Sequence, residues 1–126
     1  MYNWYAANND AGLCPSGWHL PTDDDWTTLT DYLGEESVAG EKMKSSSSDA
    51  PRWNGTNSSG FSGLLGGYRR SSGNFSTVNN LGCWWSASPN RASNAWGREL
   101  KSDDGNVGRY ANTQRNEFSV RCVRDE

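Results

Sequence analysis

Residues 94–112 read NAWGRELKSDDGNVGRYAN, and this stretch decides the fold more than any other part of the chain. Its centre holds Asp104-Gly105, a dipeptide favoured in the two-residue turns that connect hairpin strands. Apolar and polar residues alternate on both sides of this dipeptide, as they do in strands with one packed face. We therefore predict a β-hairpin with a two-residue turn at 104–105.

The alternation assigns the hairpin residues to two faces, because successive side chains of a strand point to opposite sides of the sheet. The first face looks structural and carries Trp96, Arg98, Leu100, Ser102, Val107, Arg109 and Ala111. The second face carries Gly97, Glu99, Lys101, Asp103, Asn106, Gly108, Tyr110 and Asn112. This second set has no evident packing role, which is typical of a surface selected for contact. The alternative is an ordinary solvated face, since any exposed hairpin face is polar.

Two adjacent tryptophans, Trp84 and Trp85, precede the hairpin. In a strand their indoles point to opposite sides of the sheet. One is expected in the core, and the other either shares the core or lines a pocket. Because the chain is poor in aliphatic residues, we interpret both as scaffold.

Upstream of this region the sequence predicts a helix that begins after Thr22. The Thr22 side chain can accept a backbone hydrogen bond, and aspartates 23–25 complement the positive end of the helix dipole. Gly34 can end the helix. The inward positions at helical spacing are Trp26, Leu29 and Tyr32 or Leu33.

A second helix is expected over about residues 37–44, with Val38 and Met43 inward and the polar run 45–49 as its end. From Pro51 onward, Gly and Asn interrupt short strand-like segments. The predicted fold class is therefore α+β, with two early helices followed by an irregular, β-rich half.

Composition indicates a single domain over residues 1–126 whose core depends on aromatic rings. Hydrophobic residues make up only 33% of the chain, but it contains seven Trp, five Tyr and three Phe. Large rings can build a core from few residues, so this polar chain can fold. The fourteen glycines indicate many turns.

The charge and the N-terminal sequence exclude several classes of partner. The net charge is −3, so the surface offers no basic excess to a phosphate backbone, and we expect no nucleic-acid partner. No segment approaches the roughly 20 apolar residues of a membrane span, so we expect no membrane insertion. Residues 1–10 lack a secretion signal, and the abrupt aromatic start suggests a domain of a longer protein.

The three cysteines are Cys14, Cys83 and Cys122, and none forms a CxxC or CxxH pair, which argues against a zinc site. We favour a Cys14–Cys122 disulfide, which would tie the two ends of the chain together, with Cys83 as an odd thiol. The alternative is that the thiols are reduced and buried, because sequence alone does not show proximity.

The chain lacks the motifs of a catalytic, metal or cofactor site. His19 has no recognisable catalytic partner and is interpreted as a structural hydrogen-bonding residue. Aspartates 23–25 could bind Ca²⁺, but helix capping already explains them and no EF-hand spacing follows. The glycine-rich segment 63–67 lacks the Lys-Ser/Thr of a phosphate loop. We therefore expect no catalytic residue, no metal and no cofactor. Three weak glycosylation sequons begin at Asn54, Asn57 and Asn74.

Several phrases, in order along nearly the whole chain, resemble one known family. They are YNWYAA at 2–7, CPSGWHLPT at 14–22, WNGTN at 53–57, GGYR at 66–69, WWS at 84–86 and FSVRCV at 118–123. The chain resembles the Fibrobacter succinogenes major paralogous domain. The resemblance implies a C-type-lectin-like fold of the formylglycine-generating-enzyme form, with two helices around a small twisted antiparallel sheet and long ordered loops.

The resemblance also extends to the variable proteins of diversity-generating retroelements, whose C-type-lectin-like domains carry hypervariable residues near the C-terminus. These elements randomise adenines, chiefly in Asn codons. The residues reachable from an Asn codon in this way are Arg91, Ala92, Ser93, Gly97, Asp103, Gly108, Tyr110, Ala111 and Thr113. Cys83 is reachable from a Tyr codon. Glu99, Lys101 and Gln114 are not reachable from an Asn codon, so they need another template codon or are fixed.

Together these expectations describe a binding domain with a variable surface on an aromatic scaffold. The candidate ligand-binding residues are Cys83, Arg91, Ala92, Ser93, Gly97, Glu99, Lys101, Asp103, Gly108, Tyr110, Ala111, Asn112 and Thr113. The candidate scaffold residues are Trp84, Trp85, Trp96, Arg98, Leu100 and Arg109. Tyr110 is the expected anchor, and Gly97 is among the positions expected to accept substitution.

The expected partner is an unidentified protein or glycan, bound by several copies of the domain on an extracellular, cell or virion surface. The first alternative is an invariant structural or adhesion module of a secreted bacterial protein. The second is an enzyme of the formylglycine-generating type. Fold alone does not carry activity, and the enzyme needs a reactive cysteine arrangement that Cys83 alone does not reproduce, so we expect no catalysis.

Overall fold

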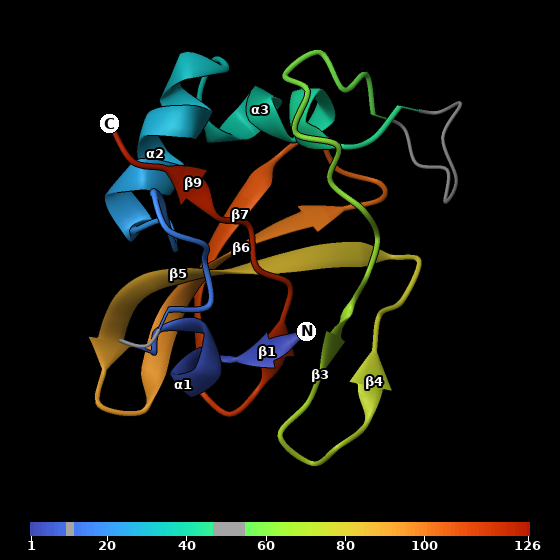
Figure 1. The fold of residues 1–126 in the computed structure, drawn as a ribbon. Coiled ribbons are helices and arrows are strands. Elements are labelled where there is room, and N and C mark those ends of the chain that lie inside the picture. The colour runs from blue at the N-terminus through green and yellow to red at the C-terminus, as the bar shows by residue number, and fades with distance from the viewer. Residues whose placement is uncertain (10–11, 47–54) are drawn as a thin grey trace.

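The computed structural model describes residues 1–9, 12–46 and 55–126, and over these ranges the chain forms three helices and nine strands (Figure 1). The helices are α1 (Trp4–Ala7), α2 (Asp23–Tyr32) and α3 (Glu36–Met43). The strands are β1 (Tyr2–Asn3), β2 (Trp18–His19), β3 (Tyr68–Arg69), β4 (Phe75–Ser76), β5 (Leu81–Arg91), β6 (Asn94–Lys101), β7 (Val107–Thr113), β8 (Glu117–Phe118) and β9 (Val123–Arg124). The predicted α+β class is confirmed as a mixed fold with small antiparallel sheets.

The longest strands form a three-stranded antiparallel sheet in the order β5-β6-β7. A second sheet has the order β1-β8-β3-β4, and β2 pairs with β9. Figure 1 shows α2 and α3 together on one side of the molecule, with α1, β1 and the β3–β4 pair toward the other. Elements from both ends of the chain therefore enclose the sheet that carries the predicted hairpin.

The strand register confirms the two predicted faces for the residues of β6 and β7, whereas Ser102, Asp103 and Asn106 lie in the loop between these strands. Trp96 pairs with Ala111 and Leu100 with Val107, whereas Gly97 pairs with Tyr110. Residues directly opposite each other on antiparallel strands point to the same side of the sheet, so each pair stays on its predicted face.

The predicted two-residue turn is wrong, because residues 102–106 separate β6 from β7. This longer loop packs against α3. The Gly40 amide donates to the Gly105 carbonyl at 2.9 Å, and Lys44 Nζ donates to the Asp104 carbonyl at 2.6 Å. A Cβ atom on Gly40 would lie 2.5 Å from the carbonyl oxygens of Gly105 and Asn106. The loop geometry is thus fixed by contacts with a distant helix rather than by its own turn dipeptide.

The two tryptophans of β5 lie in separate buried clusters. Trp84 packs with residues of α2, α3 and β6, including Trp26, Met43 and Leu100. Trp85 packs with the other cluster and stacks on Phe118, with 4.1 Å between ring centroids. Both indoles are buried, so the alternation predicted for adjacent strand residues is present and neither indole is open to solvent.

The helix predicted after Thr22 is α2, and it begins with a capping box. The Asp25 amide donates to Thr22 Oγ1 at 3.1 Å, and the Thr22 amide donates to Asp25 Oδ2 at 3.0 Å. Trp26 and Leu33 are buried, whereas Tyr32 is 86% exposed, so Leu33 is the inward residue of that predicted alternative. The local sequence signal located this helix correctly.

The second predicted helix is α3, but its inward face differs from the prediction. Met43 is buried as expected, whereas Val38 is 46% exposed. Ala39 and Gly40 are buried in its place, because the 102–106 loop approaches the helix closely and only small residues fit there. Of the predicted break at 45–49, residues 47–49 lie outside the described residues, as do Pro51, Trp53 and the sequon residue Asn54.

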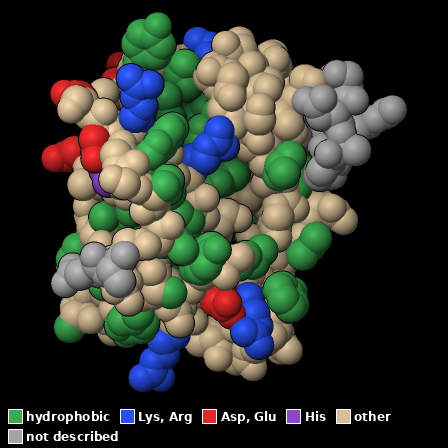
Figure 2. All heavy atoms as spheres, viewed as in Figure 1, with side chains coloured by type: hydrophobic (Ala, Val, Ile, Leu, Met, Phe, Trp, Pro, Cys, Tyr) green, Lys and Arg blue, Asp and Glu red, His purple; other side chains and the backbone are tan. Residues whose placement is uncertain are grey.

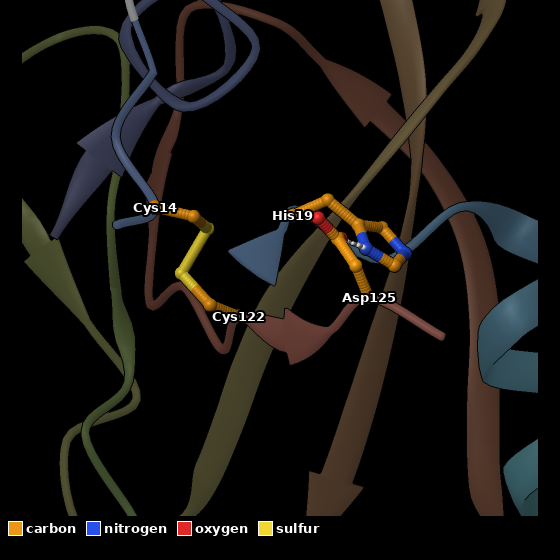
Figure 3. The surroundings of a disulfide bond; sticks show 4 residues. All are labelled: Cys14, His19, Cys122 and Asp125. Carbon is orange, nitrogen blue, oxygen red and sulfur yellow. Dashed lines mark hydrogen bonds and ion pairs between the residues drawn. A yellow bond between two sulfur atoms is a disulfide. The ribbon is translucent and has the colours of Figure 1, made fainter. Parts of the chain in front are cut away.

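The structure contains the Cys14–Cys122 disulfide, with 5.8 Å between the Cα atoms, and leaves Cys83 as a buried free thiol (Figure 3). Next to the disulfide, β2 pairs with β9, so that His19 lies opposite Val123. The last strand is therefore held against the first third of the chain by both covalent and hydrogen bonds.

Candidate functional site

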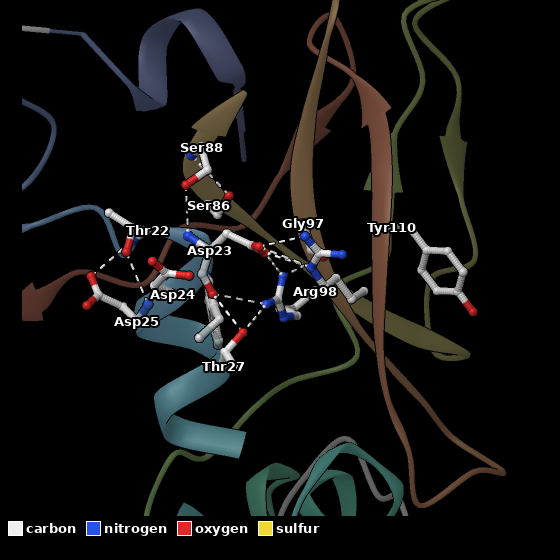
Figure 4. Close-up of polar contacts among 12 residues, drawn as sticks. Thr22, Asp23, Asp24, Asp25, Thr27, Ser86, Ser88, Gly97, Arg98 and Tyr110 are labelled. Carbon is white, nitrogen blue, oxygen red and sulfur yellow. Dashed lines mark hydrogen bonds and ion pairs between the residues drawn. The ribbon is translucent and has the colours of Figure 1, made fainter. Parts of the chain in front are cut away.

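Strand β7 is an outer strand of the three-stranded sheet, and β6 is its sheet partner within the described parts of the chain. The Tyr110 side chain projects from β7 and is 49% exposed. Figure 4 shows its ring pointing away from the polar network that joins β6 to α2. The strand thus presents an aromatic side chain to solvent beside an open row of backbone groups.

A network of charged side chains, with a buried arginine at its centre, joins β6 and β7 to α2. Arg98 of β6 has a side chain only 1% exposed, and its Nη1 lies 2.7 Å from Asp23 Oδ1. Arg109 of β7 places its Nη2 2.7 Å from the other carboxylate oxygen, Asp23 Oδ2. Arg98 Nη2 also donates to the Asp23 carbonyl at 3.1 Å. We call these three residues, Asp23, Arg98 and Arg109, the arginine clamp; Figure 4 labels Asp23 and Arg98.

The electrostatics of the arginine clamp favour the charged form of Asp23. Burial of the carboxyl group opposes ionisation, but the hydrogen bonds from Arg109 and Arg98 outweigh it, and they lower the pKa of Asp23 below its ordinary value. The Arg109 guanidinium also lies over the Trp96 ring, 3.6 Å from its centroid. The clamp therefore fixes β6 and β7 to the first residue of α2.

Two hollows lie beside β7. An open hollow of about 600 Å³ is lined by Glu36 and Ser37 of α3 and by residues 106–110. A smaller hollow of about 50 Å³ lies on the Tyr110 side, where Lys101 Nζ and Glu99 Oε1 are 3.7 Å apart. The smaller one also has Asp104, Asn106 and Gly108 in its lining. Acidic, basic, amide and phenol groups therefore surround the strand.

Gly108 has a specific role beside Tyr110. A Cβ atom at position 108 would lie 2.4 Å from Tyr110 Cε2, so the tyrosine ring occupies the space that a side chain would need. Substitution at Gly108 would therefore move Tyr110 rather than add an independent contact.

The structure divides the thirteen predicted ligand-binding residues by exposure. The exposed members are Arg91, Ala92, Ser93, Lys101, Asp103 and Tyr110. The partly exposed members are Glu99, Gly108, Ala111, Asn112 and Thr113. Cys83 and Gly97 are buried.

Cys83 and Gly97 are therefore corrections to the predicted surface. A Cβ atom on Gly97 would lie 3.0 Å from the Trp84 carbonyl oxygen and 3.2 Å from Phe118 Cε2. Phe118 covers the second hairpin face at Gly97, whereas Lys101 at the end of β6 and Tyr110 of β7 reach solvent. These tight contacts argue against the expectation that substitution at Gly97 leaves the fold intact.

The exposed members also do not converge on one point. Asn94 pairs with Thr113, which places residues 91–93 at one end of the sheet, whereas Lys101 and Asp103 lie at the other end near α3. Strands rise about 3.4 Å per residue, so the two ends are roughly 20 Å apart. The predicted set therefore forms an elongated rim with Tyr110 near its middle, not a pocket.

His19 hydrogen-bonds to two carboxylates, which agrees with its predicted structural role. Its Nδ1 lies 2.6 Å from Asp125 Oδ1 (Figure 3), and its Nε2 lies 3.0 Å from Asp25 Oδ2. Asp125 makes the larger contribution and Asp25 the smaller, and together they raise the pKa of His19 above its ordinary value. Asp125 could not be predicted as a partner from local sequence, because it lies 106 residues away.

The remaining chemistry of the described residues is limited. Burial, with a contribution from Glu99, raises the pKa of the Cys83 thiol. No cluster of three or more metal-ligating side chains occurs among the residues that the structure describes. Over the same residues, no helix is long and apolar enough to cross a membrane.

Comparison with known proteins gives one match. The family model for the Fibrobacter succinogenes major domain matches residues 1–124, nearly the whole chain. No curated protein and no solved structure matches the sequence.

Proposed function

The chain belongs to the Fibrobacter succinogenes major domain family, and on that premise we propose that it is a ligand-binding domain with a C-type-lectin-like fold and a recognition surface along β7. We further propose that it is the variable protein of a diversity-generating retroelement. Its ligand is a protein or a glycan outside the cell, met on a cell or virion surface. The Cys14–Cys122 disulfide is consistent with a secreted protein.

One observation carries the binding proposal: an exposed rim stands on a backbone that buried contacts hold in place. Tyr110 is half exposed, whereas Arg98, on the neighbouring strand, is buried against Asp23 of α2. Side chains on a fixed backbone lose little conformational freedom on binding and can be exchanged without refolding the scaffold. This separation of support from surface is what a variable binding site needs.

The chemistry of the rim favours a polar ligand with at least one flat or apolar group. Tyr110 provides a rigid ring with a hydroxyl group, and tyrosines are enriched in the centres of binding sites. Glu99 and Lys101 provide charge of both signs nearby. The rim of one domain is small, so affinity is expected to be modest and to gain from display in several copies.

The positions reachable from an Asn codon by adenine change can be sorted by their exposure in the structure. Exposed positions reachable from an Asn codon are Arg91, Ala92, Ser93, Asp103 and Tyr110. Partly exposed ones are Gly108, Ala111 and Thr113. Position 97 is reachable by codon but must remain small, and Cys83 is buried, so we propose that variability is confined to the exposed and partly exposed positions.

Two other functions remain as alternatives. An invariant structural or adhesion module would use the same fold with a fixed surface. An enzyme of the formylglycine-generating type would need an accessible thiolate, and the burial and raised pKa of Cys83 favour binding over thiol chemistry.

Two libraries of the displayed domain test whether the exposed residues can vary while the buried residues of the sheet cannot. The first randomises Ala92, Ser93, Asp103 and Tyr110, and the matched library randomises four buried residues of the sheet. The buried positions are Trp85, Ala95, Arg98 and Leu100. We expect most members of the first library to stay folded and to yield binders to at least one of several protein and glycan targets. Equal loss of folding in both libraries, or no binder from the first, would count against the proposal.

A further inference from the structure

A pocket of about 190 Å³ lies between α2, the segment around Phe61 and the C-terminal strand. It shares no lining residue with the hollows beside β7. Its apolar lining consists of Pro21, Trp26, Leu29, Phe61, Cys122 and Val123. In the view of Figure 2, hydrophobic side chains gather over α2 and β9, with cationic side chains among them.

The walls of this pocket are held in place by their own contacts. The Phe61 ring meets Trp26 and Trp84 edge to face, with centroid distances of 5.9 Å and 5.6 Å. Trp26 Nε1 donates to the Trp85 carbonyl at 3.3 Å. On the other side, Cys122 is fixed by its disulfide to Cys14. The pocket is therefore formed before any ligand arrives.

The pocket lining holds one cation, Arg121, and one carboxylate, Asp25. The Arg121 guanidinium lies over the Phe61 ring, 4.4 Å from its centroid. Among the described residues Arg121 forms no ion pair, and a stacked guanidinium keeps its N–H groups free at the ring edge. The carboxylate in the lining, Asp25, already accepts from the Thr22 amide and meets His19. An anionic ligand would thus find a donor without displacing an internal partner.

From this geometry we propose that the pocket binds a small aromatic carboxylate. Its apolar walls take one six-membered ring, and Arg121 pairs with the carboxylate at the mouth. An apolar cavity of about 150 Å³ holds a benzene molecule, so the volume here suits a ring with a short substituent. The pairing of one carboxylate with one guanidinium is geometrically specific.

The test is an NMR titration of the full chain with phenylacetate, which follows the indole N–H of Trp26. We expect saturable shifts with a dissociation constant on the order of 1 mM, since the ligand has about ten heavy atoms. The neutral analogue phenylacetamide should bind at least about tenfold more weakly, in keeping with the loss of a charged pair.

Three variants locate the site. Arg121→Gln should weaken phenylacetate binding about tenfold or more. The matched control Arg124→Gln removes a charge from β9 outside the pocket lining and should change the affinity for phenylacetate less than about twofold. Val123→Phe should fill the pocket and abolish binding of both probes. The absence of saturable shifts at about 20 mM, equal affinity for the acid and the amide, or equal effects of the two arginine variants would overturn the proposal. None of these outcomes bears on the β7 rim, which has no residue in this pocket.

Discussion

Arg98 and Arg109, on neighbouring strands, bind opposite oxygens of one carboxylate, that of Asp23, each at 2.7 Å. The contact joins the first residue of α2 to the sheet that carries the proposed rim. Arg98 is buried and Arg109 is about one-third exposed, so the arginine clamp connects the core to the surface. The position of β7, which carries Tyr110, therefore depends in part on Arg98, a side chain that is buried away from the surface.

Removal of the shared carboxylate should destabilise the protein strongly. Asp23→Ala leaves the buried Arg98 guanidinium without its carboxylate partner, and breaking a buried ion pair in this way costs about 3–5 kcal/mol. Asp24→Ala is the matched control, because Asp24 is exposed on the same helical turn and should change stability by less than about 1 kcal/mol. Urea denaturation measures both, and similar effects of the two variants would contradict the role of the clamp.

The close approach of α3 to the 102–106 loop should make Gly40 intolerant of a side chain. Gly40→Ala places a Cβ atom 2.5 Å from two carbonyl oxygens, and overpacking of this kind costs about 1–3 kcal/mol. At Gly66 the nearest atoms to an added Cβ are 3.7 Å away, so Gly66→Ala should be nearly neutral. Thermal melts of both variants provide the comparison. A Gly40→Ala protein as stable as the unmodified chain would show that the loop is not packed as described.

The disulfide and the free thiol should respond oppositely to chemical probes. The double change of Cys14 and Cys122 to Ser should lower the free energy of unfolding by about 2–5 kcal/mol, because the bridge closes a long loop. Cys83 in the native protein should resist alkylation by iodoacetamide at pH 8, since it is buried and its pKa is raised. Mass spectrometry with and without denaturant measures the labelling. Rapid labelling of Cys83 in the native state would support the enzymatic alternative.

Stability should fall as pH rises through the titration of His19. Because Asp125 and Asp25 raise the pKa of His19 in the folded state, the protonated form stabilises the fold fully below the unfolded value of about 6.5. This contribution is lost as pH rises from there through the folded pKa. NMR titration of this single histidine should give a pKa above about 6.5. His19→Gln should remove this part of the pH dependence, and an unchanged profile would exclude the histidine as its source.

The sequence predicted those features that local patterns encode. The N-cap residue Thr22 and the aspartates 23–25 located α2, and period-two alternation assigned the residues of β6 and β7 to the correct faces. Prediction from the sequence failed where contacts between distant segments determine the structure. Gly97 is buried against Phe118, and Cys83 lies in the same buried cluster as Phe118. The 104–105 turn is replaced by a longer loop that packs against α3. The partners of Asp23 lie 75 and 86 residues away, beyond any local signal.

The most direct test of the binding proposal is deep sequencing of the 3′ half of this gene across a population of its source. We predict substitutions at adenine positions of codons 91–93, 103, 108, 110, 111 and 113. Codons for Trp84, Trp85, Trp96, Arg98 and Gly97 should be spared, because these residues support the fold. Variation that is absent, synonymous, or scattered equally over all surface loops would contradict the proposal and leave an invariant adhesion or structural module.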